Sequence, residues 1–138
     1  CVGYCVQCEG ITFTLVTDCG HVTEEICAFV AKANYLVIEA NHEVEKLMAG
    51  PYPLYLKERI TSQIGHLSNA ECARTIVENA TESLKHVWLC HLSDENNHPE
   101  LARIAVTSLM ESYGLRAGVD FIVEVLRRKI PSEIYDLK

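Results

Sequence analysis

Short β-rich apolar runs alternate along this sequence with stretches that begin on helix-capping residues. This alternation restricts the chain to the α/β class of folds. Ser68-Asn69-Ala70-Glu71 has the pattern of a capping box, and Thr23 can cap a second helix whose first turn is acidic. The predicted strands are Cys1–Gln7, Ile11–Thr17, Tyr35–Glu39, His86–Cys90 and Phe121–Leu126. The predicted helices run from Thr23 to near Asn34, from Leu54 to Gln63, from Ser68 to near Leu84, and from Asn97 or His98 to near Gly114.

Polar side chains gather where the predicted strands end. Asp18, Glu39 and His91 each end or directly follow such a strand, and Asn41 and His42 come shortly after Glu39. Open α/β sheets bind their ligands at the carboxyl ends of the strands. The sequence therefore predicts that these side chains share one edge of the sheet.

Asp18 and His91 are the candidate metal ligands. A carboxylate at this edge can bind one metal ion or bridge two, and a neutral imidazole is a good ligand for zinc or manganese. Other roles remain open for both residues. Asp18 can instead hold the backbone amides of a turn, and His91 can bond to nearby loop backbone.

His66 stands in the loop before a capped helix N-terminus. Free amides at such a terminus attract an anion, and a histidine there can donate a proton to a leaving oxygen. A surface histidine with no catalytic role also fits this position. We treat His66 as the candidate catalytic residue.

Five further residues are candidates for supporting roles. They can orient the ligands from behind, or they can hold loops and cap helices without any part in chemistry, and direct metal binding also fits Glu39, Asn41 and His42. These residues are Glu39, Asn41, His42, Ser93 and Asn97.

The charge of the chain limits its partners. A net charge of −7 argues against nonspecific coating of nucleic acid, which requires a basic face. It does not exclude a nuclease, because divalent metal ions would supply positive charge where a phosphate binds. The run Arg127-Arg128-Lys129 is interpreted as a solvated face.

Cysteine usage bears on the cellular compartment. The chain has seven cysteines, several of them among apolar residues, and no apolar run is long enough to span a bilayer. We expect reduced thiols in a cytoplasmic protein without membrane contact. Cys5-Val6-Gln7-Cys8 has metal-binding spacing but no second pair, so we interpret it as part of a strand and turn.

Seven sequence clusters, taken together and in order, resemble the metallo-β-lactamase-fold hydrolases, in particular the YycJ/WalJ/VicX-like group. The resemblance runs along essentially the whole chain. The clusters are Val2-Gly3-Tyr4, Val16–Val22, Glu39–Glu45, Gly50–Pro53, Gly65–Asn69, His91–Asn97 and Pro131–Tyr135.

The resemblance implies an αββα sandwich built from two similar halves, with residues 1–138 as a single partial domain forming the C-terminal half. It implies that Asp18 bridges two metal ions, that His91 is the last metal-binding histidine and that His66 lies beside the scissile phosphate. The implied cofactor is two divalent ions, zinc or manganese. The implied reaction is phosphodiester hydrolysis by a metal-bound hydroxide, as in a DNA exonuclease.

The chain also departs from this family pattern. The family's His-x-His-x-Asp-His motif is absent, so two matched ligands, Asp18 and His91, should not hold a dinuclear site by themselves. We therefore expect an enzyme fragment that is inactive alone, exposes an apolar sheet face, and pairs with a missing N-terminal half, a partner chain or itself. The alternative hypothesis is a non-catalytic interaction module that retains half of the fold.

Overall fold

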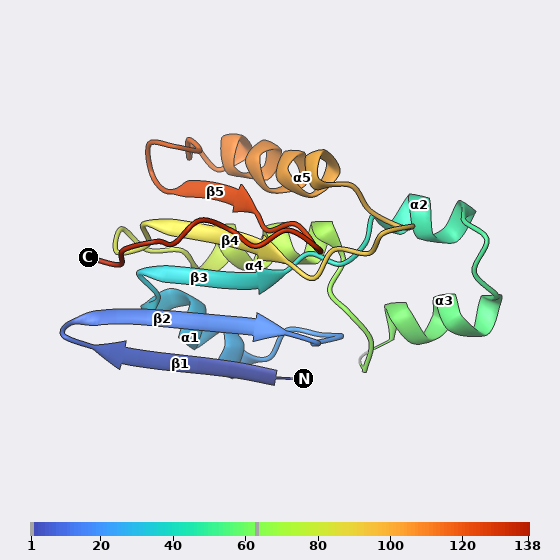
Figure 1. Ribbon diagram of the computed structural model, residues 1–138, viewed down its shortest axis with the longest axis horizontal. Helices are drawn as coiled ribbons and strands as arrows, with labels where there is room; N and C mark the ends of the chain where they lie inside the picture. Colours follow the sequence, from blue (N-terminus) through green and yellow to red (C-terminus); the bar gives the residue numbers. More distant parts are fainter. Residues whose placement is uncertain (1, 63) are drawn as a thin grey trace.

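The computed structural model describes residues 2–62 and 64–138, and its centre is a five-stranded sheet in the order β1-β2-β3-β4-β5 (Figure 1). Strand β1 is antiparallel to β2, and the other neighbours are parallel. The expectations for Cys1 and Gln63 lie outside the described residues. The strands are β1 (Val2–Cys8), β2 (Ile11–Thr17), β3 (Tyr35–Glu39), β4 (His86–Cys90) and β5 (Ile122–Val125).

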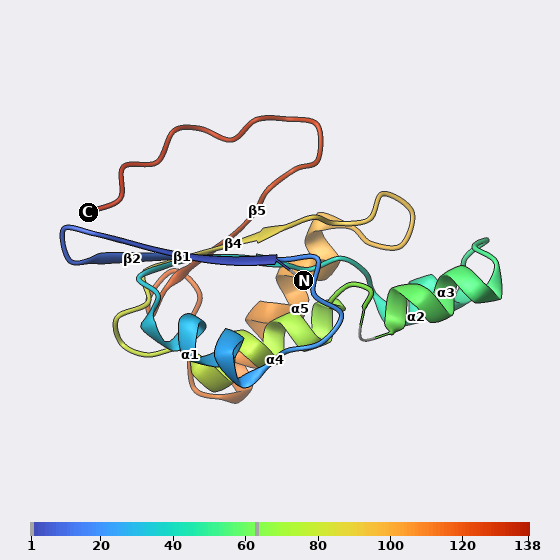
Figure 2. The same cartoon turned by 90° about the horizontal axis from the view of Figure 1, so that it is seen from below.

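The three longest helices cover one face of this sheet (Figure 2). They are α1 (Glu24–Lys32), α4 (Asn69–Asn79) and α5 (Pro99–Ser112). The parallel strands follow one another across the sheet in chain order. Right-handed crossovers that all run in one direction place α1, α4 and α5 on the same side of the sheet. Helices α2 (Val44–Ala49) and α3 (Leu54–Thr61) instead project beyond the edge of the sheet where β2, β3 and β4 end (Figure 1).

The hydrophobic core lies between the sheet and these three helices. Leu36, Ile38 and Leu89 point to this side and are fully buried, together with Ile76 of α4 and Met110 of α5. Strand residues alternate between the two faces, so the neighbours of these core residues face the other way.

The opposite face of the sheet is partly covered by the C-terminal tail, residues 126–138 (Figure 2). The ring of Tyr135 packs edge-on against Trp88, with a centroid separation of 4.9 Å. The hydroxyl of Tyr35 donates to the carbonyl of Lys138. On β1, Tyr4 and Val6 remain 60% and 56% exposed. Apolar surface is thus exposed on this face, although the tail shields its centre.

The α/β class predicted from the sequence is confirmed, and a single sheet with helices on one face is what half of an αββα sandwich requires. The prediction that the helix from Ser68 extends to near Leu84 is wrong. Helix α4 ends at Asn79, and Ala80 is extended (φ −59°, ψ 138°). The chain turns there because Leu84, only 1% exposed, must enter the core before β4 begins.

The described cysteines follow the prediction of reduced thiols with one exception. The thiols of Cys5, Cys8, Cys27, Cys72 and Cys90 are free. Cys19 is in a disulfide, so the prediction is wrong for this residue. Within residues 2–62 and 64–138, no helix has the length and apolar character that crossing a membrane requires.

Candidate metal centre

Asp18 follows the last residue of β2 and has a left-handed backbone, with φ of 54°. Few side chains adopt this conformation, but aspartate is among those that tolerate it. The turn directs the chain away from the sheet at its carboxyl edge. The side chain of Asp18 is 52% exposed there, so its carboxylate is accessible.

His91 follows β4 in the same way, with φ of 57°. Its carbonyl accepts a hydrogen bond of 2.9 Å from the side-chain amide of Asn41. Left-handed residues other than glycine cost of order 1 kcal/mol each and persist where the surroundings hold them. Asn41, one of the predicted supporting residues, thus helps to hold the conformation that brings His91 to the sheet edge.

Glu39, the last residue of β3, lies between Asp18 and His91 in the sheet and is fully buried. Its Oε1 lies 2.6 Å from Nδ1 of His91 and 2.6 Å from Nδ1 of His66. A carboxylate oxygen accepts hydrogen bonds, so both rings present Nδ1–H to Glu39. Each Nε2 is therefore left with a lone pair for a metal ion or a proton.

The four side chains converge on one point. The rings of His66 and His91 meet edge-on with centroids 5.1 Å apart. Oδ1 of Asp18 lies 3.4 Å from Nδ1 of His91 and 3.7 Å from Nδ1 of His66. One potential ligand atom from each of Asp18, Glu39, His66 and His91 lies within 4.8 Å of the others. Of these groups, the accessible carboxylate of Asp18 and the imidazole of His91 suit a divalent ion such as zinc or manganese, while Glu39 accepts from both rings.

His66 reaches this point because the loop before it packs tightly against the end of α3. The backbone amide of His66 donates to the carbonyl of Ile60 at 3.0 Å. A Cβ on Gly65 would lie 2.2 Å from the same oxygen, so only glycine fits there. Ser68 then caps α4 as predicted, accepting from the amide of Glu71 at 3.1 Å.

The segment after Glu39 connects the loops that carry the two histidines. Asn41 donates its amide to the carbonyl of Leu67 and accepts at its own carbonyl from the amide of Ser93. His42 accepts from the amide of Asn69 at 2.8 Å through its carbonyl. Asn41, predicted as a supporting residue, thus bonds to both loops through its backbone.

His42 is buried, and its Nδ1 lies 3.3 Å from Oδ1 of Asn41. Burial, with a smaller contribution from nearby His66, lowers the pKa of His42 to about 4. The ring is therefore neutral near pH 7. It does not reach the point where Asp18 and His91 converge with Glu39 and His66.

Asn97 and Asn69 form a buried pair of amides beneath the site. Each side chain donates to the other, at 2.8 and 2.9 Å, and Asn97 also donates to the carbonyl of Ala40 at 2.8 Å. Asn97 was predicted as a supporting residue, whereas Asn69 was not. Its place in the Gly65–Asn69 cluster was the signal available in the sequence.

Ser93 and Cys90 flank the site without entering the cluster. The hydroxyl of Ser93 accepts from the amide of Asn96 at 3.2 Å and so closes a turn. Burial, and then the charges of Glu39 and Asp18, raise the pKa of Cys90 to about 12. Its thiol therefore stays protonated near pH 7, and it is not one of the four side chains of the cluster. In the described part of the chain, the Asp18-Glu39-His66-His91 group is the one cluster with metal-binding geometry.

The chain resembles curated proteins along most of its length. It is 38% identical over 120 residues to the exodeoxyribonuclease YycJ of Bacillus anthracis, which is 87% of this chain and 46% of that protein. It is 41% identical over 112 residues to the exodeoxyribonuclease WalJ of Streptococcus pneumoniae strain D39, which is 81% of this chain and 42% of that protein. The chain thus spans about half the length of these relatives. No protein-family model matches it.

Proposed function

Since this chain is homologous along most of its length to the YycJ and WalJ exodeoxyribonucleases, as its resemblance predicted, we propose that it carries part of the active site of a metal-dependent exodeoxyribonuclease. The reaction is hydrolysis of a phosphodiester bond at a DNA end. The 138 residues supply one portion of a larger domain, because the relatives are about twice as long.

The proposal rests on one observation, the contact of the buried Glu39 carboxylate with the imidazoles of His66 and His91. Glu39 is fully buried, but it accepts hydrogen bonds from His66 and His91, whose side chains are partly exposed. A role in stability alone would not require two histidines to face solvent beside the accessible Asp18. Partly exposed ligands held by a buried acceptor are typical of sites that bind and act on a substrate.

Asp18 and His91 would hold the metal. A bound divalent ion supplies a Lewis acid that neutralises phosphoryl oxygens and lowers the pKa of a water molecule. Two ions need more ligands than these residues offer, so we propose that further ligands come from outside the 138 residues. Zinc and manganese both suit the donor set.

Protonated on both ring nitrogens, His66 would donate the proton on Nε2 to the leaving oxygen and return to the neutral ring with its Nδ1–H on Glu39. Its Nδ1 is held by Glu39 at 2.6 Å, and its Nε2 is therefore the atom available to a substrate. Its side chain is 30% exposed, enough to reach a phosphate at the sheet edge. A positioned general acid of this kind contributes roughly 10²- to 10⁴-fold to the rate.

The first experiment uses the polypeptide as its source produces it, whatever its full length. Native mass spectrometry with metal analysis should find two divalent ions, and DNA ends should be degraded. In His66→Gln, degradation should fall at least about a hundredfold with metal content unchanged. The matched control is His86→Gln, because His86 begins β4 at the opposite edge of the sheet.

A polypeptide that holds no metal and degrades no DNA with added zinc or manganese would overturn the proposal. The hypothesis of a non-catalytic interaction module would then take its place. The exposed Tyr4 and Val6 on the sheet face are the surface that such a module would use.

A further inference from the structure

A cavity of about 340 Å³ opens beside the loop that follows His91. The loop forms one wall, the start of α5 another, and the segment after β5 a third. Its polar lining includes Ser93, Asp94, Asn97, His98, Arg127 and Arg128. None of these side chains has a part in the metal cluster itself.

Arg127 lines this cavity, and its guanidinium group has no anionic partner in the described part of the chain. It is exposed, and it makes no hydrogen bond or ion pair with the part of the chain described here. Arg128 lies 3.6 Å from Asp94, and both side chains are more than half exposed. An exposed pair of this kind is weak and exchanges readily for another anion. Two guanidinium groups are therefore available to a ligand.

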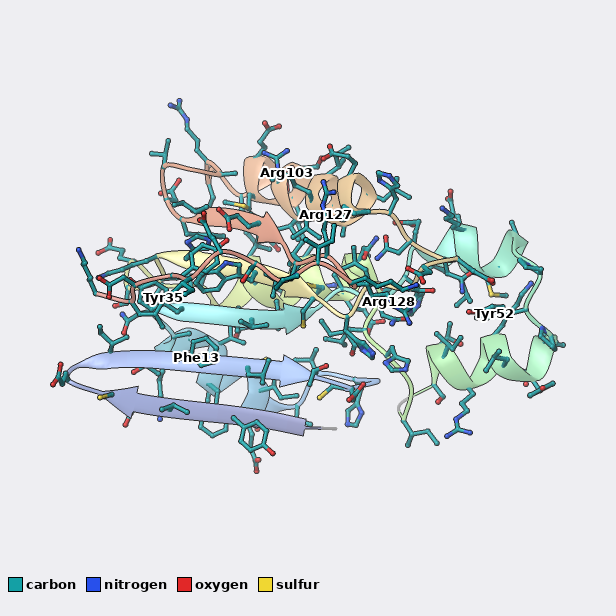
Figure 3. The ribbon with its side chains drawn as sticks, viewed as in Figure 1. Phe13, Tyr35, Tyr52, Arg103, Arg127 and Arg128 are labelled. Atoms are coloured by element: carbon teal, nitrogen blue, oxygen red, sulfur yellow. The ribbon has the colours of Figure 1, made fainter. Side chains whose placement is uncertain are left out.

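These arginines belong to a run of three basic residues in a chain that is acidic overall. The chain carries a net charge of −7, yet Arg127, Arg128 and Lys129 stand together directly after β5. Figure 3 shows Arg127 towards α5 and Arg128 beyond the carboxyl ends of β3 and β4. Asp94 and Glu100 also line the cavity, which disfavours a highly charged free anion. A phosphodiester carries a single negative charge and suits the planar fork of arginine.

The cavity also adjoins the candidate catalytic residues. Leu92 and Ser93 in its lining directly follow His91, and Asn97 bonds the carbonyl of Ala40 next to Glu39. A strand with one phosphate at His66 and His91 would pass over the loop at residues 92–97. A further phosphate of the same strand would then meet the arginines.

We propose that this cavity binds a backbone phosphate of the nucleic-acid strand through Arg127 and Arg128. The inference rests on the proposed function and deepens it. Arg127, Arg128 and Lys129 are exposed, as expected for a solvated face, and the proposal gives two of them a ligand. The contact is to the backbone, so it is independent of base sequence and serves to position the strand.

The test is the double variant Arg127→Gln/Arg128→Gln in the polypeptide as its source produces it. The probe is a fluorescent single-stranded oligonucleotide with a phosphorothioate backbone, which resists cleavage. Affinity should fall roughly tenfold at low salt, and the slope of log K against log salt should fall by about 0.7 for each contact removed. On cleavable DNA, KM should rise while kcat is retained.

The matched control is Arg74→Gln/Arg116→Gln. It removes the same charge from α4 and from the connection between α5 and β5, which lies at the far edge of the sheet. Equal losses of affinity in both double variants would overturn the proposal, because they would reflect net charge alone. Unchanged affinity and KM in the Arg127/Arg128 variant would overturn it too, even where the wild type degrades DNA and the proposed function stands.

The two proposals can fail separately. A wild type that binds the probe through these arginines but cleaves nothing supports the phosphate site and counts against the nuclease. A wild type that neither binds nor cleaves overturns both.

Discussion

Oε1 of Glu39 lies 2.6 Å from Nδ1 of His66, although 27 residues separate them in the chain. The same oxygen lies 2.6 Å from Nδ1 of His91. One buried atom thus sets the orientation and the tautomer of both candidate functional histidines. The predictions that follow concern this atom and the groups that hold it in place.

Glu39→Gln removes the shared acceptor while keeping its shape. A glutamine oxygen accepts more weakly than a carboxylate, and with that oxygen facing the two rings the amide nitrogen would face the backbone N–H of Leu67. We expect metal affinity and DNA degradation to fall by about 10- to 100-fold. This is the usual loss when a residue that hydrogen-bonds to a metal ligand is replaced in other metalloproteins. Metal titration and an exonuclease assay check this. Glu45→Gln on the exposed side of α2 is the control, and an equal loss there would contradict the prediction.

Asp18→Asn separates metal binding from folding. Asparagine also tolerates a left-handed backbone, so φ of 54° remains accessible and thermal stability should change by less than about 0.5 kcal/mol. The lost charge should lower metal affinity by at least about a hundredfold. Retained metal stoichiometry at micromolar ion concentrations, measured by elemental analysis, would argue that Asp18 only shapes the turn.

His42 makes stability depend on pH. Its pKa is about 4 in the folded chain against 6.5 in the unfolded chain, because burial disfavours the charged ring. The unfolded state therefore binds more protons below pH 6.5. The contribution is fully present above pH 6.5 and is lost as pH falls towards 4, by about 3 kcal/mol in total.

Urea unfolding of the wild type and His42→Gln at pH 7 and pH 4.5 isolates this effect. The carboxylates titrate in both proteins, so the difference between the two pH dependences belongs to His42. We expect the variant to lose less stability on acidification. Parallel pH profiles would show that His42 takes up a proton in the folded chain as easily as in the unfolded one.

Asn97→Ala tests the buried amide pair. The substitution leaves the carbonyl of Ala40 and the side chain of Asn69 without their partner, at a cost of about 2 to 4 kcal/mol. Asn79→Ala is the control. It removes a single bond, from its amide to the carbonyl of Thr75, at a half-buried helix end and should cost less than about 1.5 kcal/mol. Similar unfolding free energies for the two variants would contradict this account.

Local patterns were enough to predict most of the fold. Strands β3 and β4 have the predicted bounds, because a short apolar run between polar residues fixes where a buried strand begins and ends. The end of α4 was not predictable in this way. Residues 80–84 have helical propensity, and only the need to bury Leu84 before β4 ends the helix early. Tertiary packing overrides propensity at such points.

The sequence by itself determined the alternation of strands and helices, and with it the placing of Asp18, Glu39 and His91 at strand ends. It did not determine which of these groups touch. Glu39 meets His66 and His91 because β3 lies parallel between β2 and β4, and because Gly65 lets the next loop pack closely on α3. Those contacts span 27 and 52 residues, a range over which periodicity carries no information.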